Sequence, residues 1–492
     1  MNKSDLHRLI KIEDRIKEIM VQKGLKFDEV EFDIVPPKKM IEIMAYNSPS
    51  NISNWKFGRN YERLKTIYDN VSSHSLPYEV VINSDPHRAY LMNNNTLAVQ
   101  ALVISHVYGH VNFFTENNLF KNSRRDIINI LSSANKRFIE YEKLYGTDDI
   151  EKIIDAGHAL QLHTNIFDND ETEDEKRLRI YNHQKKMDRP ISSEFSDIII
   201  DDKHNKYNIE AYNNKLWKSL KAISPVEPTE DILRFVIDNS KILDDWQKDI
   251  LEVLRIEGQY YWPNIKTKYM NEGYAVYTHE QIMDQLFREG HLTASEHGQY
   301  NYSNSLVKAF NRETINPYLI GSVMWYDIKD RWDKGQYGSD WNECDNVKER
   351  ELWDTKEMNG AKKVDEVMRS YMDWFFMNEF LTPDIIDKSD LYVYEIIQKN
   401  HSVEYVRTGY TIEEVREMII SSFANKSIPK ISIIDSNYNK NGTLLMNHSF
   451  STLPLNKIYA KETMKHIKNI WGSDIHLRTK NSDGIKDVFL KI

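Results

Sequence analysis

Residues 97–114 read LAVQALVISHVYGHVNFF, an apolar run that holds two histidines. The run extends from about Thr96 to Phe114 and favours a buried α-helix of about five turns. His106 and His110 share one face of that helix, because they lie one turn apart. Burying two imidazoles without partners is costly, so the pair indicates a metal site in which each ring supplies one ligand. The alternative is a pair of buried histidines satisfied by ordinary hydrogen bonds.

The residue after the first histidine argues against a standard zinc peptidase. Such helices carry a glutamate there, which is the general base for the attacking water, whereas this chain has Val107. Either another carboxylate takes that role, with Glu116, Glu257 and Asp155 as candidates, or the metal site is not hydrolytic. Gly109 lies within the same helix, where glycine costs roughly 1 kcal/mol relative to alanine, which suggests a close approach to its backbone.

A second helix, MNEGYAVYTH at residues 270–279, supplies a candidate third ligand. The stretch resembles the NEG helix of gluzincin metallopeptidases, in which the glutamate binds zinc. That resemblance makes Glu272 the third ligand beside the two histidines. His279 lies two turns further on the same face, as a fourth ligand or as a hydrogen-bond partner of a ligand. The simpler interpretation is a surface glutamate followed by a packing glycine.

A third helix, YGTDDIEKIIDAGHALQLH at residues 145–163, places Glu151, Asp155 and His158 on one face. These side chains are candidates for additional ligands, or for the carboxylates that orient the two histidines through their free ring nitrogens. An ordinary solvated stripe is the alternative. The sequence does not reveal which residues bind substrate.

Composition limits the class of protein. The chain has 492 residues, 40% of them apolar, and a net charge of -10, which argues against a nucleic-acid partner. The single cysteine, Cys344, excludes an internal disulfide and a cysteine-based zinc site. No run approaches 18 apolar residues, so we expect no membrane span. The first helix lacks the features of a signal peptide, which favours a cytoplasmic protein.

The chain is predicted to be mostly helical up to about residue 395. Strands are expected in EVEFDIVPP (29–37) and LPYEVVINSDP (76–86). Thr147 is a plausible helix cap, Pro263 should interrupt a helix, and the polar segment 168–212 reads as a surface excursion. Helices are expected at about 4–24, 54–70, 96–114, 124–145, 147–163, 229–260, 264–288, 316–334 and 363–379.

The pattern changes after residue 395. Residues 428–450 predict two strands around an Asn-Gly turn, residues 461–472 a helix closed by Gly472, and residues 474–479 a final strand. We therefore predict an α+β protein with two domains. A large, mostly α-helical body covers residues 1–395 and is zincin-like if the metal site is real. A small ββαβ domain covers residues 396–492.

Eight stretches together resemble the stage V sporulation protein R (SpoVR) family. The match runs in order from about residue 30 to residue 478, nearly the full chain. The stretches are IVPPKKMIEIMAY, NWKFGRNYERL, YEVVINSDPHRAYLMNNNT, ALVISHVYGHVNFFTENNLF, YGTDDIEKIIDAGHAL, YYWPNIKTKYMNEGYA, INPYLIGSVMWYDI and WGSDIHL. The family has a large amino-terminal region and a smaller carboxy-terminal domain, in agreement with the predicted division.

The resemblance implies a role in sporulation, in which family members are implicated in forming the spore cortex, a peptidoglycan layer. Relatives also occur in bacteria that do not form spores. Combined with the candidate site, it suggests a Zn²⁺-dependent amide hydrolase or transferase that acts on cell-wall peptides or their precursors, in the mother cell of a spore former. The alternative is a non-catalytic assembly or regulatory factor for the cortex, with a structural metal or a buried histidine cluster.

Overall fold

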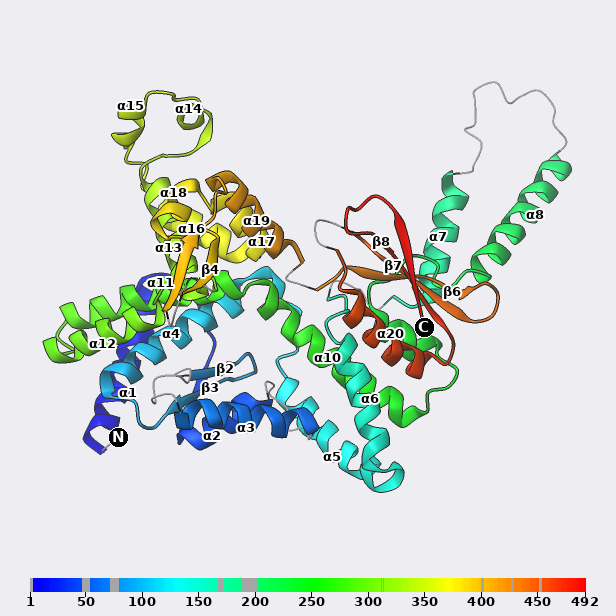
Figure 1. Ribbon diagram of the computed structural model, residues 1–492, viewed down its shortest axis with the longest axis horizontal. Helices are drawn as coiled ribbons and strands as arrows, with labels where there is room; N and C mark the ends of the chain where they lie inside the picture. Colours follow the sequence, from blue (N-terminus) through cyan, green and yellow to red (C-terminus); the bar gives the residue numbers. More distant parts are fainter. Residues whose placement is uncertain are drawn as a thin grey trace. The chain divides into compact units, whose positions relative to one another are not determined.

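The computed structural model describes residues 3–46, 54–70, 79–166, 171–187, 202–310, 312, 314–399, 402–425, 428–450 and 454–492. The chain forms two compact units (Figure 1). The first combines Met1–Ile139 with Tyr260–Ser427, and the second combines Glu140–Gln259 with Ile428–Ile492. The boundary near residue 395 was predicted between two separable domains, and it stays a prediction. In the division into compact units, the first unit continues as far as Ser427.

The first unit is mainly helical. Its strands are β1 (Val30–Val35), β2 (Glu79–Ile82), β3 (His87–Met92), β4 (Tyr394–Lys399) and β5 (Ser402–Arg407). Its helices are α1 (Lys3–Gln22), α2 (Pro37–Tyr46), α3 (Trp55–Asn70), α4 (Leu97–Glu116), α11 (Lys268–Arg288), α12 (Ala294–Val307), α13 (Pro317–Asp333), α14 (Gly338–Asn342), α15 (Val347–Glu351), α16 (Gly360–Ser370), α17 (Asp373–Phe380), α18 (Pro383–Lys388) and α19 (Ile412–Asn425).

The second unit contains helices and a four-stranded sheet. Its elements are α6 (Thr147–Leu160), α7 (Glu173–Met187), α8 (Asp202–Lys221), α9 (Ile232–Asn239), β6 (Ile431–Tyr438), β7 (Thr443–His448), α20 (Lys457–Trp471), β8 (Ile475–Lys480) and β9 (Asp487–Lys491). Of the three boundaries between the units, one lies within helix α5 (Ile127–Tyr145), one within helix α10 (Asp245–Lys266), and the third follows Ser427. The predicted α+β class, with a mostly helical body and a small carboxy-terminal sheet, is confirmed.

Helix α4 is the core of the first unit. It begins at the N-cap Thr96, whose hydroxyl accepts from the amide of Val99, and it ends at Glu116 rather than at Phe114. Nearly every side chain along it is buried. Many of these apolar side chains pack against α1 and the end of α11, which explains why the helix is apolar on all sides instead of amphipathic.

Two glycine contacts hold α4, α11 and α13 close together. A Cβ atom on Gly109 of α4 would lie 2.7 Å from Cα of Ala275 on α11, and one on Gly273 would lie 2.3 Å from Cα of Gly321 on α13. Side chains at these positions would force the helices apart. The close approach that Gly109 suggested is therefore an approach of helix α11, and Gly273 is a packing glycine.

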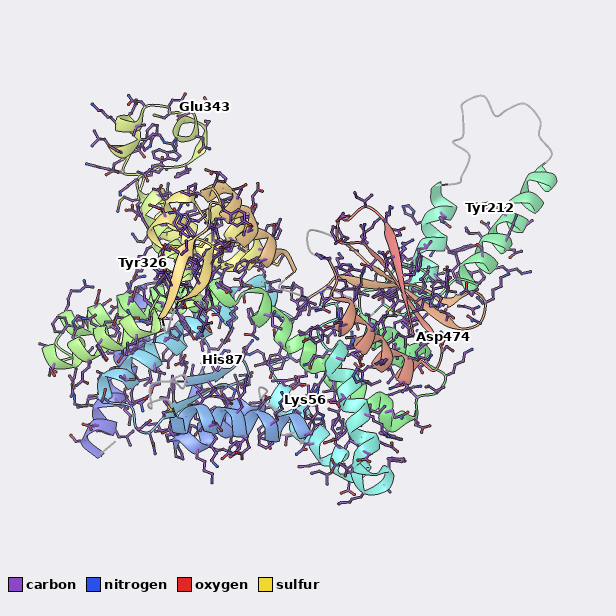
Figure 2. All side chains as sticks on the ribbon, viewed as in Figure 1. Lys56, His87, Tyr212, Tyr326, Glu343 and Asp474 are labelled. Atoms are coloured by element: carbon purple, nitrogen blue, oxygen red, sulfur yellow. The ribbon has the colours of Figure 1, made fainter. Side chains whose placement is uncertain are left out.

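A three-stranded sheet in the order β1-β3-β2 lies in the same unit. Strands β1 and β3 are parallel, and β2 is antiparallel to β3 with Glu79 opposite Leu91. Strand β3, which begins at His87 (Figure 2), was not predicted. Of the strand predicted at 76–86, the first residues, 76–78, lie outside the described residues. This pairing fixes Glu79 at the start of β2.

Three local predictions are corrected. Helix α10 continues through Pro263 and breaks at Thr267, whose hydroxyl donates to the Pro263 carbonyl. Thr147 is the first residue of α6 instead of its cap, because Gly146 occupies the cap position. The polar segment 168–212, as far as it is described, contains all of α7 and the first part of α8. Charged pairs such as Arg177–Asp174 at 2.9 Å explain how so polar a segment is helical.

The carboxy-terminal sheet has the order β6-β7-β8-β9. Strands β6 and β7 are antiparallel around a turn in which Asn439, Lys440 and Gly442 have positive φ. Helix α20 ends at Gly472 in the left-handed conformation and connects β7 to the parallel strand β8. The predicted ββαβ order is confirmed, and β9 adds one further antiparallel strand.

Candidate metal centre

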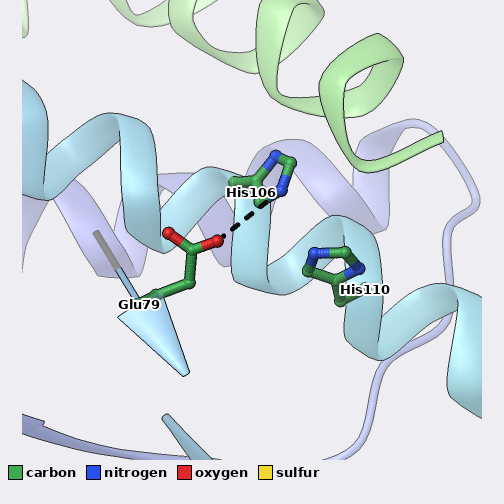
Figure 3. A group of neighbouring side chains, drawn as sticks. All are labelled: Glu79, His106 and His110. Carbon is green, nitrogen blue, oxygen red and sulfur yellow. Dashed lines mark ion pairs between the residues drawn. The ribbon is translucent and has the colours of Figure 1, made fainter. Parts of the chain in front are cut away.

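Four donor side chains meet inside the first unit. Glu79 begins β2, His106 and His110 lie on α4, and Glu272 lies on α11. Oε2 of Glu272 is 3.7 Å from Nε2 of His106 and 3.5 Å from Nε2 of His110. Oε1 of Glu79 is 3.8 Å from Nε2 of His106, and ligand atoms of Glu79 and the two histidines lie within 4.8 Å of one another. Figure 3 shows the Glu79 carboxylate pointing toward His106.

The spacing of these atoms fits one small cation. Two ligands on a tetrahedral zinc ion, with bonds of about 2.1 Å, lie about 3.4 Å apart, close to the observed separations. Nε2 of His106 and Oε2 of Glu272 are buried without a hydrogen-bond partner among the described residues. Buried polar atoms are almost always satisfied, so the two atoms point to a cation that they would share. Nitrogen and carboxylate donors of this kind suit zinc.

A chain of hydrogen bonds supports His106 from behind. Its Nδ1 lies 2.9 Å from Nδ1 of His279, and Nε2 of His279 lies 3.0 Å from Oδ1 of Asn304. If Nε2 of His106 faces a cation, its proton must be on Nδ1 and is donated to His279. His279 then donates from Nε2 to Asn304. All these polar atoms are satisfied in only one arrangement of protons.

The chain of hydrogen bonds continues beyond Asn304. Nδ2 of Asn304 donates to Oε1 of Glu280 at 2.7 Å, and Nζ of Lys308 donates to the same oxygen at 2.9 Å. An amide that must donate to Glu280 can only offer its oxygen to His279. The lysine and glutamate therefore fix the orientation of Asn304, and through it the tautomer of His279.

His110 is oriented separately. Its Nδ1 donates to Oδ1 of Asn271, 2.9 Å away on α11. Partners of this kind fix the ring orientation of metal-binding histidines. His279 and Asn271 thus make the hydrogen bonds that orient the two histidines. Glu151, Asp155 and His158 lie on α6 in the second unit, and both roles predicted for them, as orienting groups or as additional ligands, stay predictions.

The two carboxyl groups differ in electrostatics. Burial raises the pKa of Glu79 by more than the nearby His106 and His110 lower it. Burial also disfavours the Glu272 carboxylate, but the same two histidines outweigh it and hold the pKa of Glu272 well below its usual range. Burial by itself would lower the pKa of His110, and Glu272 raises it above the ordinary value. Glu272 is therefore the ionised partner of the histidines.

Tyr318, the second residue of α13, completes the centre. Its side chain lies beside Glu272, and its ring centroid lies 6.0 Å from that of His106. The Glu272 charge, together with burial, raises the pKa of Tyr318 well above its ordinary value. The group therefore stays a neutral hydrogen-bond donor next to the carboxylate. The histidine side chains are 6% and 8% exposed, whereas those of Glu79 and Glu272 are 15% and 21% exposed, so the carboxylates form the more accessible side.

The two weaker candidates for the base lie elsewhere. Glu116 is ten residues beyond His106 on α4, about 15 Å along the helix axis. Its buried carboxylate pairs with Arg369 and with Lys26, which leaves it poorly placed to serve as a base. Glu257 is buried on α10 in the part of the chain that belongs to the second unit, and its role stays a prediction.

Sequence reasoning missed Glu79, Asn271, Asn304 and Tyr318. Glu79 was inside a predicted strand, yet an alternating strand gives no sign of which carboxylate faces a distant helix. Asn271 was part of the NEG stretch, where attention fell on its neighbour. A single asparagine or tyrosine in a helix carries no recognisable spacing, so these two become visible only once α11, α12 and α13 are packed together.

The centre and the fold define the class of this protein: an α+β protein with a buried cluster of two histidines and two glutamates. Residues 3–428 match the family model described as SpoVR like protein, and residues 429–482 match the SpoVR-like C-terminal domain. The chain belongs to the SpoVR family, which confirms the resemblance of the eight stretches and associates the chain with sporulation.

A bacterial relative is similar along most of both chains. Protein YcgB of Escherichia coli (strain K12) is 29% identical over 490 residues, which cover 92% of this chain and 88% of YcgB. No solved structure matches the chain. By length and composition α4 is apolar enough to cross a membrane, but 94% of its apolar window is buried inside the protein, as in the core helix of a soluble protein.

Proposed function

We propose that the protein is a zinc-dependent hydrolase of amide bonds. The observation that carries the proposal is the convergence of Glu79, His106, His110 and Glu272 on one point, with two of their buried donor atoms lacking a hydrogen-bond partner among the described residues. A bound divalent ion would polarise an amide carbonyl and make water a better nucleophile near neutral pH. His106, His110 and Glu272 would hold the ion.

Glu79 takes the role of the glutamate that is missing at Val107. A general base must lie within reach of the attacking water and have a pKa near the working pH. Glu79 lies beside the proposed ligands and is partly exposed, and burial raises its pKa. In the hydrolysis, Glu79 accepts a proton from water while the water oxygen bonds to the acyl carbon. The proton then passes to the amine nitrogen as the C–N bond breaks.

The family's association with sporulation suggests the substrate. A cell-wall peptide or its precursor contains amide bonds of the required kind, and formation of the spore cortex would require their processing. A protein in the cytoplasm of the mother cell would encounter precursors. A transferase that uses the same activated carbonyl would follow the same two steps, with an amine in place of water as the nucleophile that bonds to the acyl carbon.

The rival function is a non-catalytic assembly factor in which a metal or the buried histidines only hold helices together. A structural zinc site normally has all four positions filled by protein. If Glu79 binds the ion as a fourth ligand, the centre is structural, whereas if it does not, one position stays open for water. The role of Glu79 therefore separates the two functions.

The test is the metal content of the purified full chain, measured by plasma mass spectrometry after equilibration with zinc. We expect one zinc per chain in the wild type, loss of zinc in His106→Ala and Glu272→Gln, and retention in Glu79→Gln. The Glu79 variant should lose peptide-amide hydrolysis and cortex formation in a spore former. Absence of bound metal in the wild type would overturn the proposal, and loss of zinc in Glu79→Gln would support the structural function. Stoichiometric iron instead of zinc would point to redox chemistry.

A further inference from the structure

A cavity of about 810 Å³ opens at the start of α13. Its wall includes Phe310, Arg312, Tyr318 and Tyr405. Small-molecule sites in proteins usually measure roughly 300–1,000 Å³, so this cavity has the size of a ligand site. All its lining residues belong to the first unit, which also contains the metal centre.

Tyr318 connects this cavity to the centre. Tyr318 lines the cavity, and its ring centroid lies 6.0 Å from that of His106. The same residue therefore borders both the cavity and the cluster of proposed zinc ligands. A tyrosine hydroxyl can donate its hydrogen to a carbonyl oxygen of a molecule in the cavity.

Arg312 gives the cavity a positive charge. Its guanidinium lies over three aromatic rings, those of Phe310, Tyr394 and Tyr405, with its carbon 5.0–5.8 Å from their centroids. It pairs with Asp390 at 3.7 Å, which is too long for a hydrogen bond. Stacking fixes the plane of the group, and its N–H donors match the two oxygens of a carboxylate.

A second cavity of about 250 Å³ adjoins the first, and the two share Phe310, Arg312, Thr314, Ile315 and Asn316. Beyond the shared residues, most of its wall is apolar, from α13, α19 and the segment before β4, including Leu319, Leu391, Val393, Val415 and Met418. Arg312 therefore lies where the smaller, mostly apolar cavity meets the larger cavity that Tyr318 lines.

We propose that the two cavities form the substrate groove of the centre and select a peptide with a free carboxylate next to an apolar side chain. The inference rests on the proposed hydrolase function. Arg312 binds the carboxylate, the smaller cavity takes the apolar side chain, and the amide bond to be cleaved lies near Tyr318. Addition of one water across that bond releases an apolar amino acid and leaves a new carboxylate on the shortened peptide.

The probe is N-benzoylglycyl-L-phenylalanine, compared with its carboxamide and with N-benzoylglycylglycine, using calorimetric titration of the zinc-loaded full chain. We expect the acid to bind at least tenfold more tightly than the carboxamide. Arg312→Gln should abolish that preference. Met418→Trp should weaken binding of the phenylalanine peptide but not binding of the glycine peptide. Arg88→Gln is the matched control, because Arg88 is also exposed and paired with one acidic residue, Glu31.

The outcomes separate this inference from the proposed function. Carboxylate preference is also measured in Glu272→Gln, which should lack zinc but keep the groove. If this variant retains the preference while neither it nor the wild type hydrolyses the probe, the inference of a substrate groove is supported and the proposed hydrolase function is wrong. If wild type and Arg312→Gln bind acid and carboxamide equally, with zinc still present, the groove inference is wrong. Unchanged melting temperatures show that the variants are folded.

Discussion

His279 is expected to control how tightly the centre binds zinc without touching the ion. It accepts a hydrogen bond from Nδ1 of His106 and donates one to Asn304. His279→Leu removes both bonds and leaves a buried N–H of His106 without a partner. At about 1 kcal/mol net for each bond, the loss is about 2 kcal/mol. These bonds also exist without zinc, so part of the loss lowers the stability of the zinc-free protein, and zinc affinity should fall by about 10–100-fold, the range known for loss of such partners.

The assay is competition for zinc against a chromophoric chelator, with the melting temperature of the zinc-free protein measured in parallel. His279→Gln can both accept and donate, and should recover much of the affinity, which a purely structural role would not predict. His297→Leu is the control, because His297 lies on the neighbouring helix α12, stacks on Phe287, and makes its hydrogen bonds to Asp284 and Asn301 instead of to His106, His279 or Asn304. Wild-type affinity in His279→Leu, or equal affinities in the leucine and glutamine variants, would refute the reasoning.

Other substitutions test the packing and charge of the first unit. Gly109→Ala should destabilise the protein by about 1–3 kcal/mol in denaturant unfolding, because the added Cβ meets the backbone of Ala275. The matched Gly298→Ala on α12, where nothing lies within 4 Å, should be neutral or stabilising by up to about 1 kcal/mol. Burial lowers the pKa of His87 to about 4, below its unfolded value of about 6.5. Stability present above pH 6.5 is therefore lost as the pH falls toward 4, by at most about 3 kcal/mol, and His87→Gln should flatten that part of the unfolding profile. Val107→Glu should destabilise by several kcal/mol and give no hydrolysis, because Val107 is fully buried in the apolar core. Hydrolysis by a folded double variant, Val107→Glu with Glu79→Gln, would contradict the assignment of the base to Glu79.

The two histidines could be placed on one face from helical spacing, whereas Glu272 was predicted from the resemblance of its NEG stretch to the gluzincin helix. Two imidazoles one turn apart share a face in any α-helix, and the NEG stretch carries its own local pattern. The order of strands and helices in the carboxy-terminal sheet was predictable for the same reason, since the Asn-Gly turn and Gly472 act within a few residues. Each of these patterns involves residues that are close together in the sequence.

The remaining parts of the centre depend on contacts between distant segments. Glu79 faces His106 only because β2 pairs with β3, and β3 itself lacked a clear strand pattern. The partner of Glu116 is Arg369, more than 250 residues away, so no local pattern could show that this carboxylate was engaged. The close approach of α4, α11 and α13 depends on where glycines meet, which is a property of pairs of helices.

Val107 acquires a clear explanation from this arrangement. The side chain directly after His106 is turned about 100° around the helix, and in α4 that direction leads into the apolar cluster against α1. A glutamate there would be buried without water or a partner. In a helix that is covered on all sides, the base must therefore come from another element with a route to solvent. Glu79, at the first residue of a short strand and partly exposed, meets that requirement. The valine thus argues against the usual arrangement of a zinc peptidase helix, but not against hydrolysis itself.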